Sequence, residues 1–148
     1  MIREFGLEDL GVVFKEIFKP RLEECTIFTF QGPLGVGKTT LIREILGDCG
    51  VTAVITSPTF TYVNTYTGEN GRIFNHFDLY RVGSQEFFVD AAFDEYLHQK
   101  TACNLIEWPA VIEDLLASDS LKSKVCKIIL SYDEKDLSKR IIEVVDPI

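Results

Sequence analysis

One segment of the sequence carries the residue types that phosphate binding requires, at the required spacing. The pattern Gly-x-x-x-x-Gly-Lys-[Ser/Thr] is met by Gly32, Gly37, Lys38 and Thr39. Glycines let the backbone curl so that several N–H groups point at phosphate oxygens, and a following helix presents its positive N-terminal dipole to the same anion. Lys38 can reach the β- and γ-phosphates, and the Thr39 hydroxyl can ligate magnesium. The segment predicts a nucleoside triphosphate site with contacts from Gly32, Leu34, Gly35, Val36, Gly37, Lys38, Thr39 and Thr40.

A phosphate loop of this kind also needs an acidic partner for magnesium, and the sequence offers two candidates. Glu107 ends the mostly apolar run 102–106, which is typical of an interior parallel strand. Asp78 ends a run in which polar and apolar residues alternate. Because ligands gather at the carboxyl ends of parallel strands, Thr39 and Glu107 are the expected metal ligands. Asp78 is then free to orient or activate water near the γ-phosphate. A structural salt bridge is the alternative role for either acid.

The choice of nucleotide and reaction follows from motifs that the chain lacks. GTP-binding proteins select guanine with an Asn-Lys-x-Asp motif, and none of the four asparagines precedes a lysine. ATP is therefore the expected nucleotide. Small-molecule kinases usually carry an arginine-bearing lid, and no arginine pair occupies a candidate lid here. Hydrolysis is favoured, and two alternatives stay open: a small-molecule kinase, and a nucleotide-dependent interaction module without meaningful catalysis.

The expected helices and strands place these residues in an α/β protein. Helical periodicity covers 8–18 and the segment after the phosphate loop, where Gly47 suits the C-terminal cap. Ser84 can cap a further helix that extends to Tyr96. Strand-like runs occupy 26–30, 54–55, 61–66, 72–80, 102–106, 125–132 and 140–145. The pattern predicts a P-loop NTPase-like three-layer fold with a mixed sheet and a C-terminal β-hairpin, as one domain over residues 1–148.

Composition limits the classes of function. The net charge of −8 and the absence of a basic cluster argue against a protein that mainly grips nucleic acid. No apolar run approaches the roughly 18 residues that span a bilayer, and residues 1–6 do not resemble a secretory signal. We expect a cytoplasmic protein without membrane contact. The four cysteines form no Cys-x-x-Cys pair, which favours buried reduced thiols over a zinc site.

Four segments together carry a family resemblance that covers nearly the whole chain. They are Gly32 to Thr40, Ser57-Pro58-Thr59-Phe60, His76-Phe77-Asp78-Leu79-Tyr80-Arg81 and Ile106-Glu107-Trp108-Pro109. The phosphate loop is generic, but the other three segments in this order and spacing are much more specific. The sequence resembles the TsaE family, small bacterial P-loop ATPases needed for the threonylcarbamoyladenosine modification of certain tRNAs.

The resemblance implies roles for individual residues. Thr59 belongs to a switch near the γ-phosphate, Asp78 lies at the nucleotide site, and Glu107 binds magnesium together with Thr39. The implied catalytic residues are therefore Lys38, Asp78 and Thr59, and the implied cofactors are ATP and Mg²⁺. His76 is read as a hydrogen-bonded strand histidine rather than a base. Nucleotide contacts from residues 5–10 or from Lys135, Lys139 and Arg140 are implied only weakly.

The resemblance also implies protein partners. TsaE-like proteins act with TsaD-like and TsaB-like proteins, which carry out threonylcarbamoyl transfer, and ATP hydrolysis resets that complex between turnovers. The tRNA would be contacted only indirectly, through these partners, which fits the acidic charge.

Overall fold

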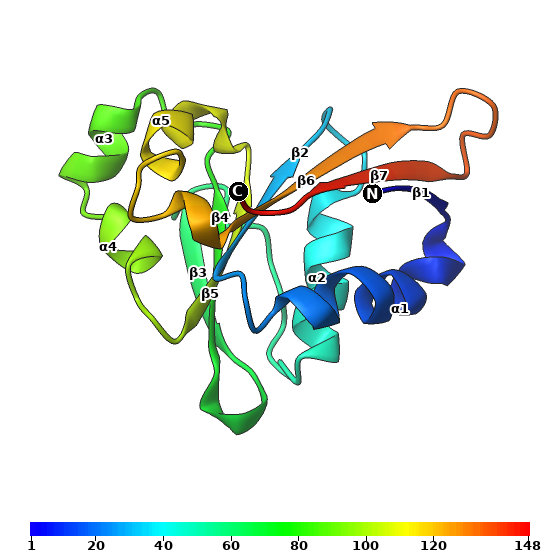
Figure 1. Cartoon of the computed structure of the whole chain (residues 1–148), viewed down its shortest axis with the longest axis horizontal. Coiled ribbons are helices and arrows are strands. Elements are labelled where there is room, and N and C mark those ends of the chain that lie inside the picture. Colours follow the sequence, from blue (N-terminus) through cyan, green and yellow to red (C-terminus); the bar gives the residue numbers. More distant parts are fainter.

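A seven-stranded mixed sheet forms the centre of the computed structural model, which describes residues 1–148 (Figure 1). Its strands are β1 (Ile2–Phe5), β2 (Ile27–Gln31), β3 (Val63–Thr67), β4 (Ile73–Asp78), β5 (Ala102–Glu107), β6 (Val125–Tyr132) and β7 (Arg140–Val145). Their order across the sheet is β1-β7-β6-β2-β5-β4-β3. The four central strands β6, β2, β5 and β4 are parallel, whereas β3, β7 and β1 each pair antiparallel with their neighbour.

Helices cover the sheet on both faces (Figure 1). On one face lie α1 (Leu10–Val13), which continues through further helical turns to Arg21, and α2 (Lys38–Asp48). On the other face lie α3 (Gln85–Asp90), α4 (Asp94–Leu97) and α5 (Glu113–Leu116). The two groups of helices stand on opposite sides of the sheet in Figure 1. None of the helices is both long enough and apolar enough to cross a membrane.

Strand alternation divides the buried side chains between the two faces. Phe28 and Phe30 of β2 pack in the core beneath α1 and α2, whereas Ile27 belongs to the smaller core beneath α3 to α5. The central strand β5 is buried at all six positions because it has a parallel neighbour on each side and helices on both faces. This strand delivers Glu107 to the carboxyl edge of the sheet, as the sequence predicted.

The expected fold class is confirmed, including the C-terminal hairpin, whose strands β6 and β7 have the predicted bounds. One predicted strand is wrong, because Val54 and Ile55 lie in irregular backbone between α2 and β3. Ile55 packs against the larger core, but Val54 is largely exposed and no neighbouring strand pairs with the two residues to hold them extended. Strand β1 was not foreseen. It has only four residues, and its pairing partner β7 lies at the other end of the chain.

Two helix ends also differ from the sequence expectation. Helix α2 contains Gly47 and ends at Asp48, and Gly50 takes the left-handed conformation after it (φ 87°). The Val51 N–H donates to the Leu46 carbonyl across this turn, which satisfies a helix-end acceptor. The helix expected to run to Tyr96 is instead two short helices, because Ala92 breaks it with a positive φ of 62°.

The cysteines match the prediction of buried reduced thiols. All four are free, and Cys25, Cys103 and Cys126 are buried. Burial raises the pKa of the Cys103 thiol to about 12 and that of Cys49 to about 11. The thiols of Cys49 and Cys103 therefore stay protonated at neutral pH and pack as apolar groups rather than acting as nucleophiles or metal ligands.

Candidate functional site

The phosphate loop connects the end of β2 to the start of α2. Gly32, Gly35 and Gly37 all have positive φ angles (154°, 79° and 111°), so glycine is required where the chain turns most sharply. The N–H groups of residues 37–40 donate to no protein acceptor. These unpaired donors at the N-terminus of an 11-residue helix form a cradle for an anion such as phosphate.

Two alanine substitutions within this loop and helix are expected to change stability in opposite directions. A Cβ at Gly32 would lie 2.6 Å from the Leu130 carbonyl oxygen, in a backbone conformation that alanine rarely adopts. Gly32→Ala should therefore lower the free energy of unfolding by about 2 kcal/mol or more. A Cβ at Gly47 meets nothing within 4 Å, so Gly47→Ala should raise stability by about 0.5–1 kcal/mol through helix propensity.

Thermal denaturation of the wild type and of the two variants, Gly32→Ala and Gly47→Ala, measures both changes in stability. At roughly 2–4 °C per kcal/mol for a chain of this size, the two midpoints should lie on either side of the wild-type value. Equal midpoints for all three proteins would show that the backbone at Gly32 is not constrained as described.

The side chain of Lys38 folds back over its own loop. Its Nζ donates to the carbonyls of Gly32 and Pro33 and lies 3.8 Å from the centre of the Trp108 ring. Burial lowers the pKa of Lys38 below its ordinary value of 10.5, and the charges of Glu107 and Asp78 offset part of that shift. The ammonium group is therefore held at the cleft by partners that a phosphate could replace.

Thr39 and Glu107 meet at the carboxyl edge of the sheet. The Thr39 Oγ1 donates to Glu107 Oε1 at 2.8 Å, and the glutamate side chain is almost fully buried. Hydroxyl and carboxylate oxygens are the hard donors that magnesium prefers, so this pair fits the expected ion. No group of three or more histidine, cysteine or acidic residues is placed to hold a metal. The pair alone cannot complete an octahedral shell, and a magnesium ion would need further oxygen ligands from nucleotide and water.

The segment 57–60 lies across the cleft from the phosphate loop. Ser57 Oγ lies 3.3 Å from Thr59 Oγ1 and donates to Asp78 Oδ2 at 3.4 Å. Asp78 Oδ1 accepts the Tyr80 N–H at 3.0 Å. Asp78 and Glu107 are opposite each other in the register of β4 and β5, so the two acids share one edge of the sheet. Asp78 is therefore linked to the segment that carries Thr59.

These residues surround a cleft of about 420 Å³, within the size range of small-molecule sites. Its lining residues are Leu34, Gly35, Gly37, Lys38, Thr39, Thr40, Ser57, Thr59, Asp78, Tyr80, Arg81, Glu107 and Trp108. The structure thus brings together most of the predicted site. Gly32 and Val36 are the exceptions: Val36 packs into the core, and Gly32 meets Lys38 through its carbonyl at the base of the loop.

The C-terminal hairpin supports the phosphate loop in a way that the sequence did not reveal. The Tyr132 hydroxyl donates to the Leu34 carbonyl at 3.3 Å, and Arg140 Nε donates to the Val36 carbonyl at 3.0 Å. The Arg140 guanidinium also lies over the Tyr132 ring. Arg140 therefore contacts the loop backbone from behind, and it does not line the cleft.

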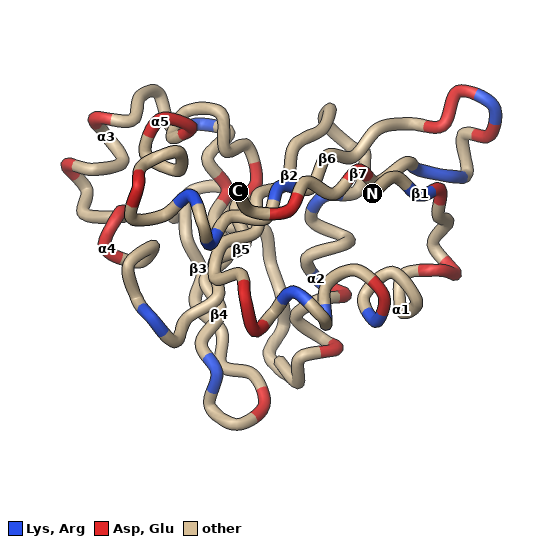
Figure 2. Tube along the Cα trace, in the orientation of Figure 1, with Lys and Arg blue, Asp and Glu red and all other residues tan.

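The other weakly implied nucleotide contacts also lie outside the cleft. Residues 5–10, Lys135 and Lys139 are absent from its lining. Lys139 instead forms an ion pair with Glu8, which ties the hairpin to the N-terminal helical turns. Figure 2 shows basic and acidic positions interspersed along the trace, which agrees with the absence of a basic cluster in the sequence.

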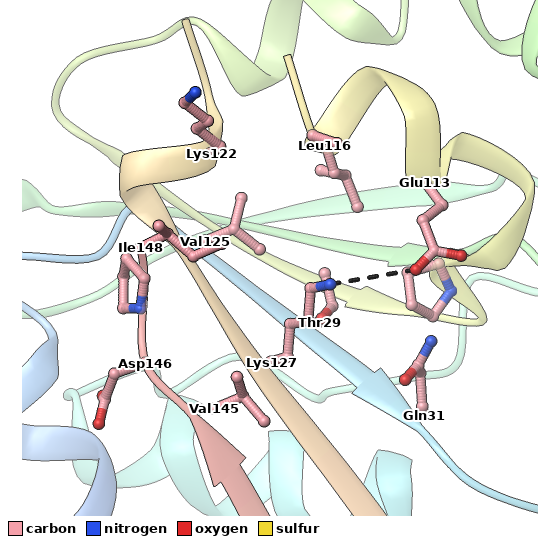
Figure 3. Close-up of a pocket in the computed structure, with 13 residues that line it drawn as sticks. Thr29, Gln31, Glu113, Leu116, Lys122, Val125, Lys127, Val145, Asp146 and Ile148 are labelled. Atoms are coloured by element: carbon pink, nitrogen blue, oxygen red, sulfur yellow. Dashed lines mark ion pairs between the residues drawn. The ribbon is translucent and has the colours of Figure 1, made fainter. Parts of the chain in front are cut away.

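A second, smaller hollow of about 160 Å³ lies on the sheet face that α5 covers (Figure 3). Its walls include Leu116, Val125 and Val145, and Lys127 and Glu113 face each other across it at 4.0 Å. No predicted site residue lines this hollow. Its mainly apolar walls and balanced charges do not resemble a phosphate site.

Comparisons with known proteins agree with this fold and identify a family. The family model for the threonylcarbamoyl adenosine biosynthesis protein TsaE matches residues 7–141. The TsaE protein of Borreliella burgdorferi is 35% identical, over 87% of this chain and 93% of its own. That of Rickettsia conorii is 34% identical, over 82% of this chain and 74% of its own. The crystal structure of Bacillus subtilis YdiB superposes with a TM-score of 0.61, covering 96% of this chain and 84% of that chain at 23% identity.

A central parallel sheet with a glycine-rich loop between β2 and α2 defines a P-loop type of α/β protein. Within that class, the chain belongs to the TsaE family, which takes part in tRNA threonylcarbamoyladenosine biosynthesis. The family resemblance that the four sequence segments indicated is confirmed.

Proposed function

We propose that the chain is a magnesium-dependent ATPase of low intrinsic activity that acts with TsaD-like and TsaB-like proteins in threonylcarbamoyladenosine modification of tRNA. The observation that carries the proposal is the convergence of Lys38, Thr39, Asp78 and Glu107 on one cleft beside four unpaired backbone N–H groups. Every one of these groups has a role in binding and cleaving a nucleoside triphosphate.

The phosphate loop and Lys38 would bind the triphosphate. The N–H groups of residues 37–40 would donate to phosphate oxygens, and Lys38 would exchange its partners, the Gly32 and Pro33 carbonyls, for β- and γ-phosphate oxygens. Because Lys38 begins with two carbonyl partners and an aromatic ring beneath it, phosphate binding must replace contacts that already exist. This competition supports a modest affinity.

Hydrolysis would use the groups around the γ-phosphate. Thr39 and Glu107 would hold magnesium, whose charge would stabilise negative charge on the phosphate oxygens. Asp78 would orient the attacking water, and its link through Ser57 would position Thr59 on the same side. Lys38 would stabilise the charge that develops in the transition state. Arg81 is the one arginine that lines the cleft, and no arginine pair sits in a candidate lid, which disfavours a small-molecule kinase.

The partner assignment rests on family membership. The acidic net charge supports indirect contact with tRNA through the partner proteins, because a phosphate backbone would repel most of this surface. Tyr80 lines the cleft and Phe60 directly follows the cleft residue Thr59, and these two exposed side chains provide apolar contact area where a partner could sense the nucleotide state.

A reconstituted modification assay tests this proposal against its two alternatives. With the TsaD-like and TsaB-like proteins of the same organism, ATP should support many rounds of tRNA modification, and a nonhydrolysable ATP analogue should stop the reaction after about one round. If the analogue supported as many rounds of modification as ATP does, the protein would be an interaction module without meaningful catalysis. ATP consumption that depends on a small-molecule acceptor and yields a phosphorylated product would establish a kinase.

A further inference from the structure

His76 is a fully buried polar residue directly behind the cleft. It lies on β4, two residues before Asp78, and parallel pairing of β4 with β5 places it diagonally beside Glu107. Its Nε2 lies 2.7 Å from Glu107 Oε2, while the other carboxylate oxygen accepts the Thr39 hydroxyl. The three side chains therefore form one hydrogen-bonded series, His76–Glu107–Thr39, in which both oxygens of the carboxylate are engaged.

The second ring nitrogen identifies the proton that His76 carries. Nδ1 is buried and has no hydrogen-bond partner. A proton on Nδ1 would be a buried donor without an acceptor, whereas a bare Nδ1 leaves only a lone pair unpaired. The geometry therefore favours the tautomer that carries its proton on Nε2 and donates it to Glu107 Oε2.

We propose that His76 is a positioning residue whose Nε2–H donates to Glu107 Oε2 and so orients the carboxylate, keeping Oε1 directed at Thr39 and at a bound magnesium ion. This inference rests on the proposed function, because it assigns a role toward the same metal site. Outer-shell partners that orient metal ligands typically change metal affinity by about 10- to 100-fold when they are removed. His76 should therefore set magnesium affinity and leave the phosphate-loop contacts unchanged.

Three variants separate orientation of the carboxylate from simple packing. His76→Phe keeps a ring of similar size and removes the N–H donor. His76→Gln returns an amide N–H close to the position of Nε2. His98→Gln is the matched control, because His98 is the only other histidine and is exposed.

The affinity for Mg²⁺, with Mn²⁺ as a second probe, is measured with each variant saturated with a nonhydrolysable ATP analogue. His76→Phe should weaken metal binding at least about 10-fold, whereas His76→Gln and His98→Gln should stay within about 3-fold of wild type. Analogue affinity in EDTA should be the same for all four proteins. Unchanged metal affinity in His76→Phe would overturn this inference about His76 and would leave the proposed function standing. If wild type showed no metal-dependent binding of the analogue, the proposed function would fail and this inference with it.

A spectroscopic measurement on the wild type is independent of any folding defect in the variants. Nitrogen-15 NMR of the histidine rings in the nucleotide-free protein should show His76 protonated at Nε2 and bare at Nδ1, with an Nε2 proton protected from solvent exchange. His98 provides the exchanging reference signal. Detection of the Nδ1–H tautomer at His76 would contradict the proposed orientation of the pair.

Discussion

Replacing Lys38 with alanine is expected to weaken ATP binding by about 10- to 150-fold, the largest effect on affinity of any single change in the cleft. The side chain supplies charge-assisted hydrogen bonds to phosphate, which are worth about 1.5–3 kcal/mol. The substitution also removes the donor to the Gly32 and Pro33 carbonyls and the contact with Trp108, so the thermal midpoint of the variant is measured alongside its ATP affinity. Calorimetric titration with ATP and magnesium measures the effect.

Lys122→Ala is a suitable control for that experiment. Lys122 pairs with Asp119 at the surface and lines the second hollow, away from the cleft. Its removal should leave ATP affinity within about 2-fold of wild type, since exposed ion pairs contribute little. If both lysine variants bound ATP like the wild type, the phosphate site would have been assigned to the wrong residues.

Replacing Glu107 with glutamine is expected to reduce ATP hydrolysis by at least about 100-fold, the typical loss when one group that stabilises transition-state charge is removed. Glutamine keeps the size of the side chain but lacks the charge, and it cannot accept hydrogen bonds at both ends from Thr39 and His76. Binding of ATP in EDTA should be unchanged or slightly tighter, because a negative charge near the phosphates is lost. Single-turnover hydrolysis with a magnesium titration separates these two effects.

Glu113→Gln provides the matching acid-to-amide control. Glu113 faces Lys127 in the second hollow and has no contact with the cleft (Figure 3). It should hydrolyse ATP at the wild-type rate. If the Glu107→Gln variant also kept the wild-type rate and magnesium requirement, another acid would have to bind the magnesium ion, and Asp78 would be the first candidate.

The sequence predicted the parts of the fold that depend on local pattern. The mostly apolar run before Glu107 correctly indicated a buried parallel strand, and the strand-like runs 125–132 and 140–145 correctly indicated both strands of the hairpin. Local pattern also placed α2 directly after the phosphate loop. It misassigned the helix end because Gly47 and Gly50 both suit a cap, and only tertiary contacts decide between them.

The supporting contacts of the site could not be predicted because their partners are distant in sequence. His76 and Glu107 are 31 residues apart, and Arg140 reaches the Val36 carbonyl across 104 residues. No spacing rule connects a strand histidine to an acid on the neighbouring strand until the register is known. A side chain that binds a backbone carbonyl, as Arg140 does, leaves even less signal, because every residue offers a carbonyl.

Mapping of backbone amide shifts by NMR on addition of ATP and magnesium tests most directly whether this cleft binds the nucleotide. The largest shifts should fall on the amides of residues 37–40, whose N–H groups are unpaired in the structure, and the Trp108 indole should shift with them as Lys38 leaves its ring. Shifts that gather instead around Glu113, Leu116 and Val145 at the second hollow, or no saturable shifts at all, would contradict the account.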